Sequence, residues 1–149
     1  MRTAGDVLAT KGSNVYWIDP LASVFDALKE MNDKNVGALC VMIDEYLVGI
    51  VSERDYVRHV ILDRNASEQT KVSEIMTRDV IKVNSDAPID ECLSLMKEHG
   101  FRHLPVVGDD GKMIGIISIG DVVNSRLAEL EAESESLRHS IEARRWQPS

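Results

Sequence analysis

The chain has 149 residues and a formal net charge of −8 at pH 7, and 44% of its residues are hydrophobic. That length is enough to bury a hydrophobic core, either as one medium domain or as two half-sized repeats. The acidic balance argues against nonspecific binding to nucleic acid and to acidic membranes, because both would repel the chain.

Two further features concern the compartment in which the chain works. No apolar run approaches the length of a membrane span, and residues 1–6 lack the hydrophobic core of a signal peptide, so we expect a cytoplasmic protein. Cys40 lies in an apolar strand pattern and Cys92 on the apolar face of a helix. Two buried, reduced thiols are therefore predicted, in place of a disulfide or a metal site.

The hydrophobic pattern of the first half predicts a mixture of helices and strands. Val24, Ala27, Leu28 and Met31 recur at the spacing of one helix face, and this helix should end near residues 35–37. In order, the predicted elements are a short helix over 4–11, a strand over 15–18, the helix from 24, strands over 39–43 and 47–51, and a helix over 53–61. The polar residues 62–71 are expected to connect the two halves.

The second half repeats this order. Ile89, Cys92, Leu93 and Met96 reproduce the helix face that begins at Val24, at an offset of 65 residues. The predicted elements are a short helix over 72–76, a strand over 80–83, a helix over 89–99 that ends at glycine, and strands over 104–107 and 113–117. The turn at 109–112 is one residue longer than its counterpart and raises the offset to 66, which indicates a duplication.

One seven-residue pattern occurs in both halves, from Gly49 to Asp55 and from Gly115 to Asp121. Each copy runs from glycine through two β-branched residues to a serine, and the aspartate follows three positions later, where a helix is predicted to begin. Unpaired N–H groups at such a junction suit a phosphate, and the two carboxylate oxygens suit the hydroxyls of a ribose. The pattern therefore indicates a nucleoside phosphate.

The same spacing of serine and aspartate is also typical of a helix cap. In a capping box, both side chains bond only to amides of the first turn. For either copy alone, the cap is the stronger interpretation. Repetition of the whole surrounding context favours the binding site, because a local cap does not require it.

These residues together resemble tandem CBS domains. The resemblance rests on the doubled Gly-x-x-Ser-x-x-Asp pattern, on residues 73–77 and on residues 101–106, and it covers roughly residues 4–128. It implies an α+β fold, a Bateman module of two β-α-β-β-α repeats related by a pseudo-twofold axis. We assign residues 1–68 to the first repeat, 69–128 to the second, and 129–149 to an amphipathic helical extension at the C-terminus.

The resemblance also implies adenine nucleotides, such as AMP, ATP or NAD, bound in clefts between the repeats. In the better cleft Asp55 would hold the ribose, Ser52 would face phosphate, and Val80 would flank adenine. Basic side chains would neutralise the phosphate. Carried over to this sequence, the residues of this cleft are Ser52, Arg54, Asp55, Thr77, Val80, Arg102, His103 and Pro105.

A second cleft would set Tyr16, Gly37 and Ala38 opposite Ser118 and Asp121. Fewer cations would meet phosphate there, because this cleft lacks counterparts of the basic residues of the first, so Lys11 or a partner subunit would have to supply one. We expect this cleft to bind a nucleoside more weakly, to bind a larger ligand or to stay empty.

The module implied by the resemblance senses or regulates and has no catalytic role. His99 and His103 stand four residues apart, but Gly100 is expected to end the helix between them, so we predict no metal site. The alternative is a ligand-independent dimerisation or scaffold protein in which the serine and aspartate pairs only cap helices. The regulated partner is not identified by the sequence.

A heptad pattern continues beyond the duplicated unit. Apolar residues step by four and three along one helix face, with one polar position in the series. The members of this series are Val123, Leu127, Leu130, Ser134, Leu137 and Ile141. Because this helix is long for one repeat to cover, we predict that it pairs with a second subunit in a homodimer.

Overall fold

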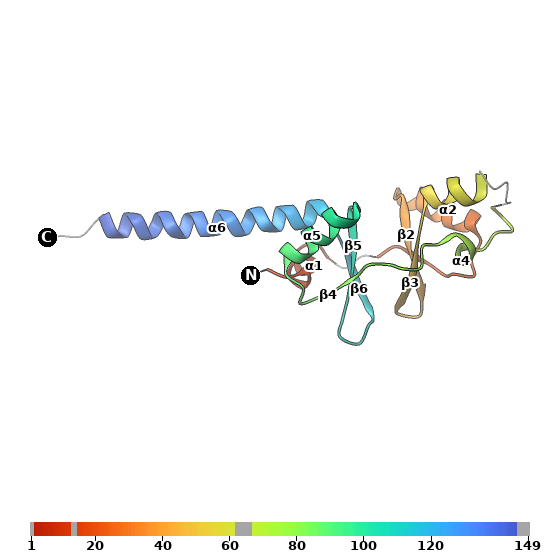
Figure 1. Ribbon diagram of the computed structural model, residues 1–149, viewed down its shortest axis with the longest axis horizontal. Helices are drawn as coiled ribbons and strands as arrows, with labels where there is room; N and C mark the ends of the chain where they lie inside the picture. Colours follow the sequence, from red (N-terminus) through yellow and green to blue (C-terminus); the bar gives the residue numbers. More distant parts are fainter. Residues whose placement is uncertain (1, 13–14, 62–66, 146–149) are drawn as a thin grey trace.

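The computed structural model describes residues 2–12, 15–61 and 67–145, and side chains as far as residue 139. Two α+β units stand side by side, and a long helix leaves one of them (Figure 1). Each unit contains a three-stranded sheet in which the first strand pairs parallel to the second and the second pairs antiparallel to the third. This arrangement confirms the predicted pair of α+β repeats. Half of the connection predicted at 62–71, residues 62–66, lies outside the described residues.

The first repeat follows the predicted order closely. Its helix α2 ends at Asn35, which adopts the left-handed conformation (φ 55°) that commonly stops helices. After β3 the chain turns directly into α3, and a π-helical turn, η1, continues it. The elements are α1 (Ala4–Lys11), β1 (Trp17–Ile18), α2 (Val24–Lys34), β2 (Ala38–Ile43), β3 (Tyr46–Ser52), α3 (Glu53–Tyr56) and η1 (Val57–Ile61).

The second repeat has the same order and ends in the long helix. Gly100, with φ 73°, closes α5 as predicted. The elements are α4 (Val72–Ile75), β4 (Val83–Asn84), α5 (Ile89–His99), β5 (His103–Val107), β6 (Met113–Ser118) and α6 (Ile119–Arg145). Helix α6 runs without interruption from the repeat into the predicted extension at 129, whereas residues 146–149 lie outside the described part.

The two short helices at the start of the repeats are exchanged. Helix α1 buries Val7 and Leu8 in the core of the second repeat, beside α5 and β6, whereas α4 buries Val72 and Ile75 in the core of the first. Each fully buried aliphatic side chain contributes roughly 1.5–3 kcal/mol. Matching bridges accompany the exchange, from Thr3 to Pro88 and from Ser23 to Lys71. Residues 4–11, which we assigned to the first repeat, therefore pack on the second.

The first strands of the repeats are shorter than predicted, and a proline shifts one of them. In the first repeat the N–H of Cys40 donates to the carbonyl of Tyr16 (3.0 Å), next to the first residue of β1. The equivalent position in the second repeat is Pro105, which has no N–H to donate. Strand β4 consequently begins at Val83, so the strand predicted at 80–83 was placed too early, whereas β1 lies within the predicted 15–18 and is only shorter.

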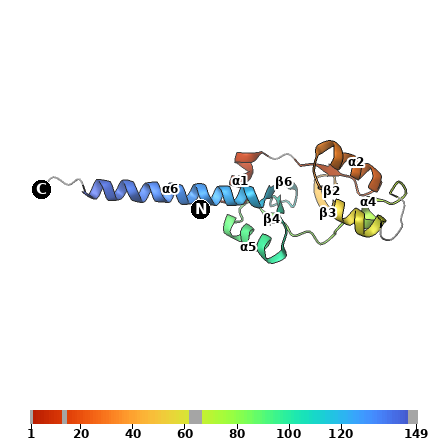
Figure 2. The same cartoon turned by 90° about the horizontal axis from the view of Figure 1, so that it is seen from above.

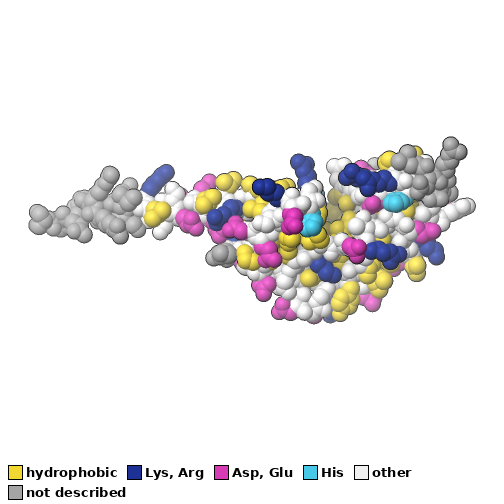
Figure 3. All heavy atoms as spheres, viewed as in Figure 1, with side chains coloured by type: hydrophobic (Ala, Val, Ile, Leu, Met, Phe, Trp, Pro, Cys, Tyr) yellow, Lys and Arg dark blue, Asp and Glu magenta, His cyan; other side chains and the backbone are white. Residues whose placement is uncertain are grey.

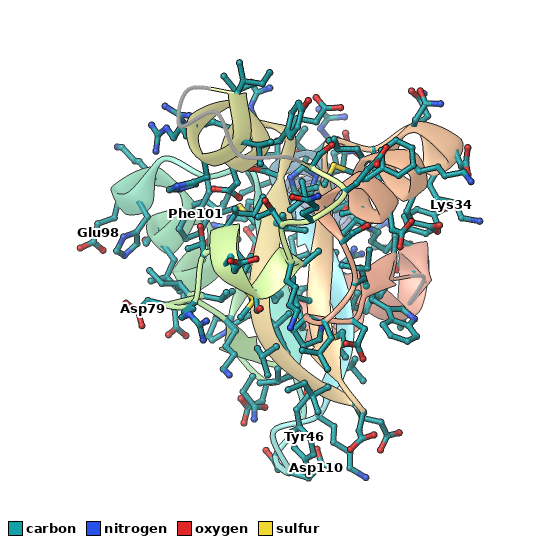
Figure 4. All side chains as sticks on the ribbon, turned by 90° about the vertical axis from the view of Figure 1, so that its right-hand side faces the viewer. Lys34, Tyr46, Asp79, Glu98, Phe101 and Asp110 are labelled. Atoms are coloured by element: carbon teal, nitrogen blue, oxygen red, sulfur yellow. The ribbon has the colours of Figure 1, made fainter. Side chains whose placement is uncertain are left out.

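A third group of apolar residues joins the repeats. Cys40, Met42 and Leu47 of the first sheet pack with Met113 and Ile116 of the second. Beyond them the tips of the two hairpins meet, where Tyr46 and Asp110 lie close together in Figure 4.

The hairpin tips are held by bonds between the repeats. The N–H of Met113 donates to the carbonyl of Glu45 (2.9 Å), and the Lys112 ammonium lies 2.9 Å from the Glu45 carboxylate. These contacts at the hairpin tips fix how the two sheets face each other at their opposite ends, where the candidate site lies.

Candidate functional site

A cavity of about 780 Å³ lies between the repeats and is lined by both of them. We call it the inter-repeat cavity. Its volume falls within the range of roughly 300–1,000 Å³ that is usual for small-molecule sites. The predicted site residues on its wall are Tyr16, Gly37, Ala38, Ser52, Arg54, Asp55, Thr77, Val80, Arg102, His103 and Pro105. Residues predicted for two separate clefts thus share one cavity, and Ser118 and Asp121 are not on its wall.

The corner between β3 and α3 supplies one polar group to the inter-repeat cavity. Oδ2 of Asp55 accepts hydrogen bonds from the Ser52 N–H (2.9 Å) and hydroxyl (3.0 Å), and the Asp55 N–H donates to that hydroxyl (3.2 Å). This is the capping box that the sequence left as an alternative. The second oxygen, Oδ1, has no hydrogen-bond partner among the described residues. Asp55 therefore caps α3 and still has an acceptor for a ligand.

The twin corner between β6 and α6 is closed by a lysine. Asp121 Oδ2 accepts from the Ser118 N–H (2.9 Å) and from the Lys11 ammonium (2.6 Å), which also donates to the Ile116 carbonyl (3.0 Å). Partial burial acts to raise the pKa of Asp121, but hydrogen bonds from Lys11 and Ser118 outweigh it and hold this pKa below its ordinary value of 3.8. Lys11 thus neutralises Asp121, while it also lies on the wall of the inter-repeat cavity.

Serine or threonine followed three residues later by aspartate caps other helices of this chain as well. Thr3 and Asp6 form a capping box at α1, and the Ser23 hydroxyl accepts from the Asp26 N–H (3.0 Å) at α2. The spacing alone is therefore a capping device. Only its position on the wall of the inter-repeat cavity distinguishes Asp55.

Three arginines line the cavity without a side-chain partner among the described residues. Arg54 and Arg58 lie one helical turn apart on α3 and η1, so they share a face. Arg102 comes from the loop before β5, and the N–H of Ile119 holds this loop by donating to the Arg102 carbonyl (2.8 Å). Basic and histidine side chains flank the hollow between the repeats in Figure 3. In an acidic chain, this local positive charge favours an anionic ligand.

Apolar and aromatic groups complete the wall. Val80 and Ile81 lie before β4, and Phe101 stacks on the His99 ring with centroids 5.5 Å apart. Aliphatic and aromatic surfaces of this kind suit a flat, weakly polar ring. Sequence reasoning missed Arg58 and His99 as members of this wall; the spacing of Arg58 one turn after Arg54 was the available signal for the former.

Comparison with known proteins identifies the family. The family model described as "CBS domain" matches residues 4–62 and again residues 72–128. The chain belongs to the CBS-domain family. Its two repeats form a CBS pair, as the sequence resemblance predicted.

Relatives and solved structures cover nearly the whole pair. CBSX3, a mitochondrial CBS domain-containing protein of Arabidopsis thaliana, is 38% identical over 94% of this chain and 72% of its own length. A structure of a CBS-domain protein from Burkholderia ambifaria MC40-6 has a TM-score of 0.74 and 45% identity, covering 85% of this chain and 94% of that one. The structure of Arabidopsis CBSX2 in complex with AMP has a TM-score of 0.72 and 30% identity, covering 86% and 98%.

The described residues of the CBS pair contain neither a membrane-spanning helix nor a metal-binding cluster. No helix in the described part of the chain combines the length and the apolar character needed to cross a bilayer. Within residues 2–12, 15–61 and 67–145, no cluster of three or more His, Cys, Asp and Glu side chains is arranged to hold a metal ion. Cys40 and Cys92 are both free and buried, as predicted.

Proposed function

We propose that this CBS pair is a regulatory module that binds an adenine nucleotide, such as AMP, ATP or NAD, in the inter-repeat cavity and transmits the bound state to a partner. The carrying observation is that one cavity contains an Asp55 oxygen and three arginine side chains for which the described residues offer no side-chain partner. The AMP complex of CBSX2, which is 30% identical, supports the choice of ligand. The ribose hydroxyls donate to Asp55, and the arginines meet the phosphate.

The module holds one nucleotide per chain under this proposal. Asp121, the twin of Asp55, is already bonded to Lys11 and lies off the cavity wall. A second ribose there would have to displace a 2.6 Å ion pair. The proposed role is regulatory and not catalytic, and it excludes conversion of the nucleotide to products over long incubation.

Calorimetry with AMP, ATP and NAD tests this proposal. Asp55→Asn and Asp121→Asn form a matched pair, because the asparagine oxygen can still accept the N–H bond of the preceding serine, and each variant loses one carboxylate from equivalent corners. We expect Asp55→Asn to weaken binding roughly 10- to 100-fold, the value of one charge-assisted hydrogen bond, whereas Asp121→Asn retains wild-type affinity. Equal losses in both variants would remove the role given to Asp55.

The alternative function, a scaffold that needs no ligand, predicts a different result. In that case none of the three nucleotides would raise the melting temperature, whereas a ligand present at 100 times its dissociation constant stabilises the folded chain by roughly 2.7 kcal/mol. A cytoplasmic location also stays a prediction, and the mitochondrial label of CBSX3 makes a localisation experiment worthwhile.

A further inference from the structure

The distal part of helix α6, residues 130–139, lacks packing against other described residues that would explain its stability. Near its start, Val122 and Ser125 are buried among α1 and α5. Figure 2 shows those helices on opposite sides of the first turns, with α6 projecting beyond them. Residues 130–139 are all exposed. Isolated helices of about 15 residues are marginal in water, so this segment requires a partner to be stable.

The exposed segment carries an apolar seam. Val123, Leu127, Leu130 and Leu137 follow one another on one helix face and expose 40%, 51%, 44% and 65% of their surface. Ser134 occupies the position between the last two. Leucines that recur with this heptad spacing are buried in coiled coils, where each inserts between side chains of the facing helix. The seam therefore predicts a second helix along α6.

We propose that the distal α6 pairs with α6 of a second copy as a parallel, in-register, two-stranded coiled coil. Beside the seam, Arg126 and Glu133 hold one flanking position of the heptad, and Glu131 and Arg138 hold the other. In a parallel pair, a residue at the first of these positions faces the residue at the second that lies five positions further along the partner. That geometry sets Arg126 against Glu131 and Glu133 against Arg138, on both sides of the dimer.

The opposite orientation is disfavoured by charge. In an antiparallel pair that keeps the seam from Val123 to Ile141 in contact, Leu130 of one helix packs against Ser134 of the other. The middle of one helix then lies beside the middle of its partner. That middle holds Glu129, Glu131, Glu133 and Glu135, so like charges would face each other across the dimer. The same run of glutamates repels an acidic membrane surface.

Some of the flanking groups already have partners. Arg126 lies 3.1 Å from the Glu129 carboxylate and 3.5 Å from that of Asp90. An ion pair between Arg126 and Glu131 of the second copy would therefore compete with these two contacts. Glu133 and Arg138 have no partner among the described residues, and this pair is the sharper determinant of orientation. Ser134, the polar layer of the seam, favours one register, because a polar group of one helix then faces its equivalent in the other.

Cysteine cross-linking of the full-length chain tests orientation and register together. Ser134→Cys places a thiol on the seam, and Ala132→Cys, the matched control, places one on the outer face two residues away. The native thiols of Cys40 and Cys92 are buried, which raises their pKa to about 12 and about 11, so they react little with oxidised glutathione. We expect a disulfide-linked dimer for Ser134→Cys and monomer for Ala132→Cys. Equal cross-linking of both variants, or of neither, would overturn the proposal.

An exchange of charge between Glu133 and Arg138 provides a second test of the proposal. Glu133→Arg is expected to weaken the dimer, measured without nucleotide by light scattering, and Arg138→Glu in the same chain is expected to restore it, because both flanking pairs are then reversed. An antiparallel dimer would show no such rescue, and a monomer mass for the wild-type chain would exclude the dimer altogether. Because neither arm uses nucleotide, failure here leaves the proposed ligand site untouched, and failure of nucleotide binding leaves the dimer untouched.

Discussion

The ammonium of Lys11 lies 2.6 Å from Oδ2 of Asp121, at the corner that is the internal twin of Ser52 and Asp55. Lys11 is the last residue of α1, the helix that packs on the second repeat. The exchange of α1 between repeats therefore places a cation on one corner, whereas the equivalent carboxylate at the other corner forms no ion pair within the described part of the chain. Two nearly identical stretches of sequence acquire different chemistry from their neighbours.

The ion pair predicts a stability difference that depends on pH. Because the pKa of Asp121 is lowered in the folded chain, its contribution is present above the unfolded value of about 3.8 and is lost as the pH falls through the lower folded value. Both side chains are partly exposed, so we expect Lys11→Met to lower the free energy of unfolding by only about 0.5–1 kcal/mol at pH 7. Urea unfolding should show this gap shrinking well below pH 3.8. A gap unchanged across that range would contradict the assignment.

Exchange of the short helices predicts which repeat each one stabilises. Leu8 and Ile75 are 5% and 4% exposed, and each lies in the core of the opposite repeat. Truncation of either to alanine should cost about 2–5 kcal/mol. By hydrogen exchange, Leu8→Ala should reduce the protection of β5 and β6, whereas Ile75→Ala should reduce that of β2 and β3. The reverse assignment would show that each helix packs on its own repeat.

Two equivalent glycines should differ in their tolerance of alanine. A Cβ on Gly49 would lie 2.7 Å from Met76 Sδ and 2.9 Å from the Thr77 carbonyl oxygen, which belongs to the backbone. The three atoms nearest to a Cβ on Gly115 would all belong to the side chain of Leu8, the closest being Cδ2 at 2.6 Å. Since a side chain can move more easily than a backbone, we expect Gly49→Ala to cost about 2–3 kcal/mol and Gly115→Ala about 1 kcal/mol. Equal denaturation midpoints for the two variants would contradict this ranking.

The arginines of the inter-repeat cavity predict a salt-dependent affinity. Arg54→Gln or Arg102→Gln should weaken nucleotide binding about fivefold at low salt, because each removes about 1 kcal/mol of partly exposed charge attraction. Arg78 provides the control, since it lies off the cavity wall and bonds to the Ser73 carbonyl (3.0 Å). Near 1 M salt, where the screening length is about 3 Å, the difference from wild type should shrink. Calorimetry at several salt concentrations measures both effects.

Local patterns were sufficient to predict most of the elements. The spacing of apolar residues marked α2 and α5, and Gly100 marked the end of α5, because these features depend on neighbours within one or two turns. The first strands were predicted too long and β4 too early, because β1 and β4 are set by the N–H groups of β2 and β5, and Pro105 withholds one of them. Strand ends of this kind depend on a partner that is distant in sequence.

The sequence by itself determined the duplication and the order of elements, because repeated spacing and helix periodicity are written in consecutive residues, and its resemblance to CBS domains indicated eleven of the residues on the cavity wall. It did not determine that α1 and α4 exchange places, that both predicted clefts contribute to one cavity, or that Lys11 neutralises Asp121 and no other carboxylate. Only the tertiary structure decided these points. They depend on contacts between residues as far apart as Lys11 and Asp121, and a repeated local pattern is the same whether or not a distant cation reaches it.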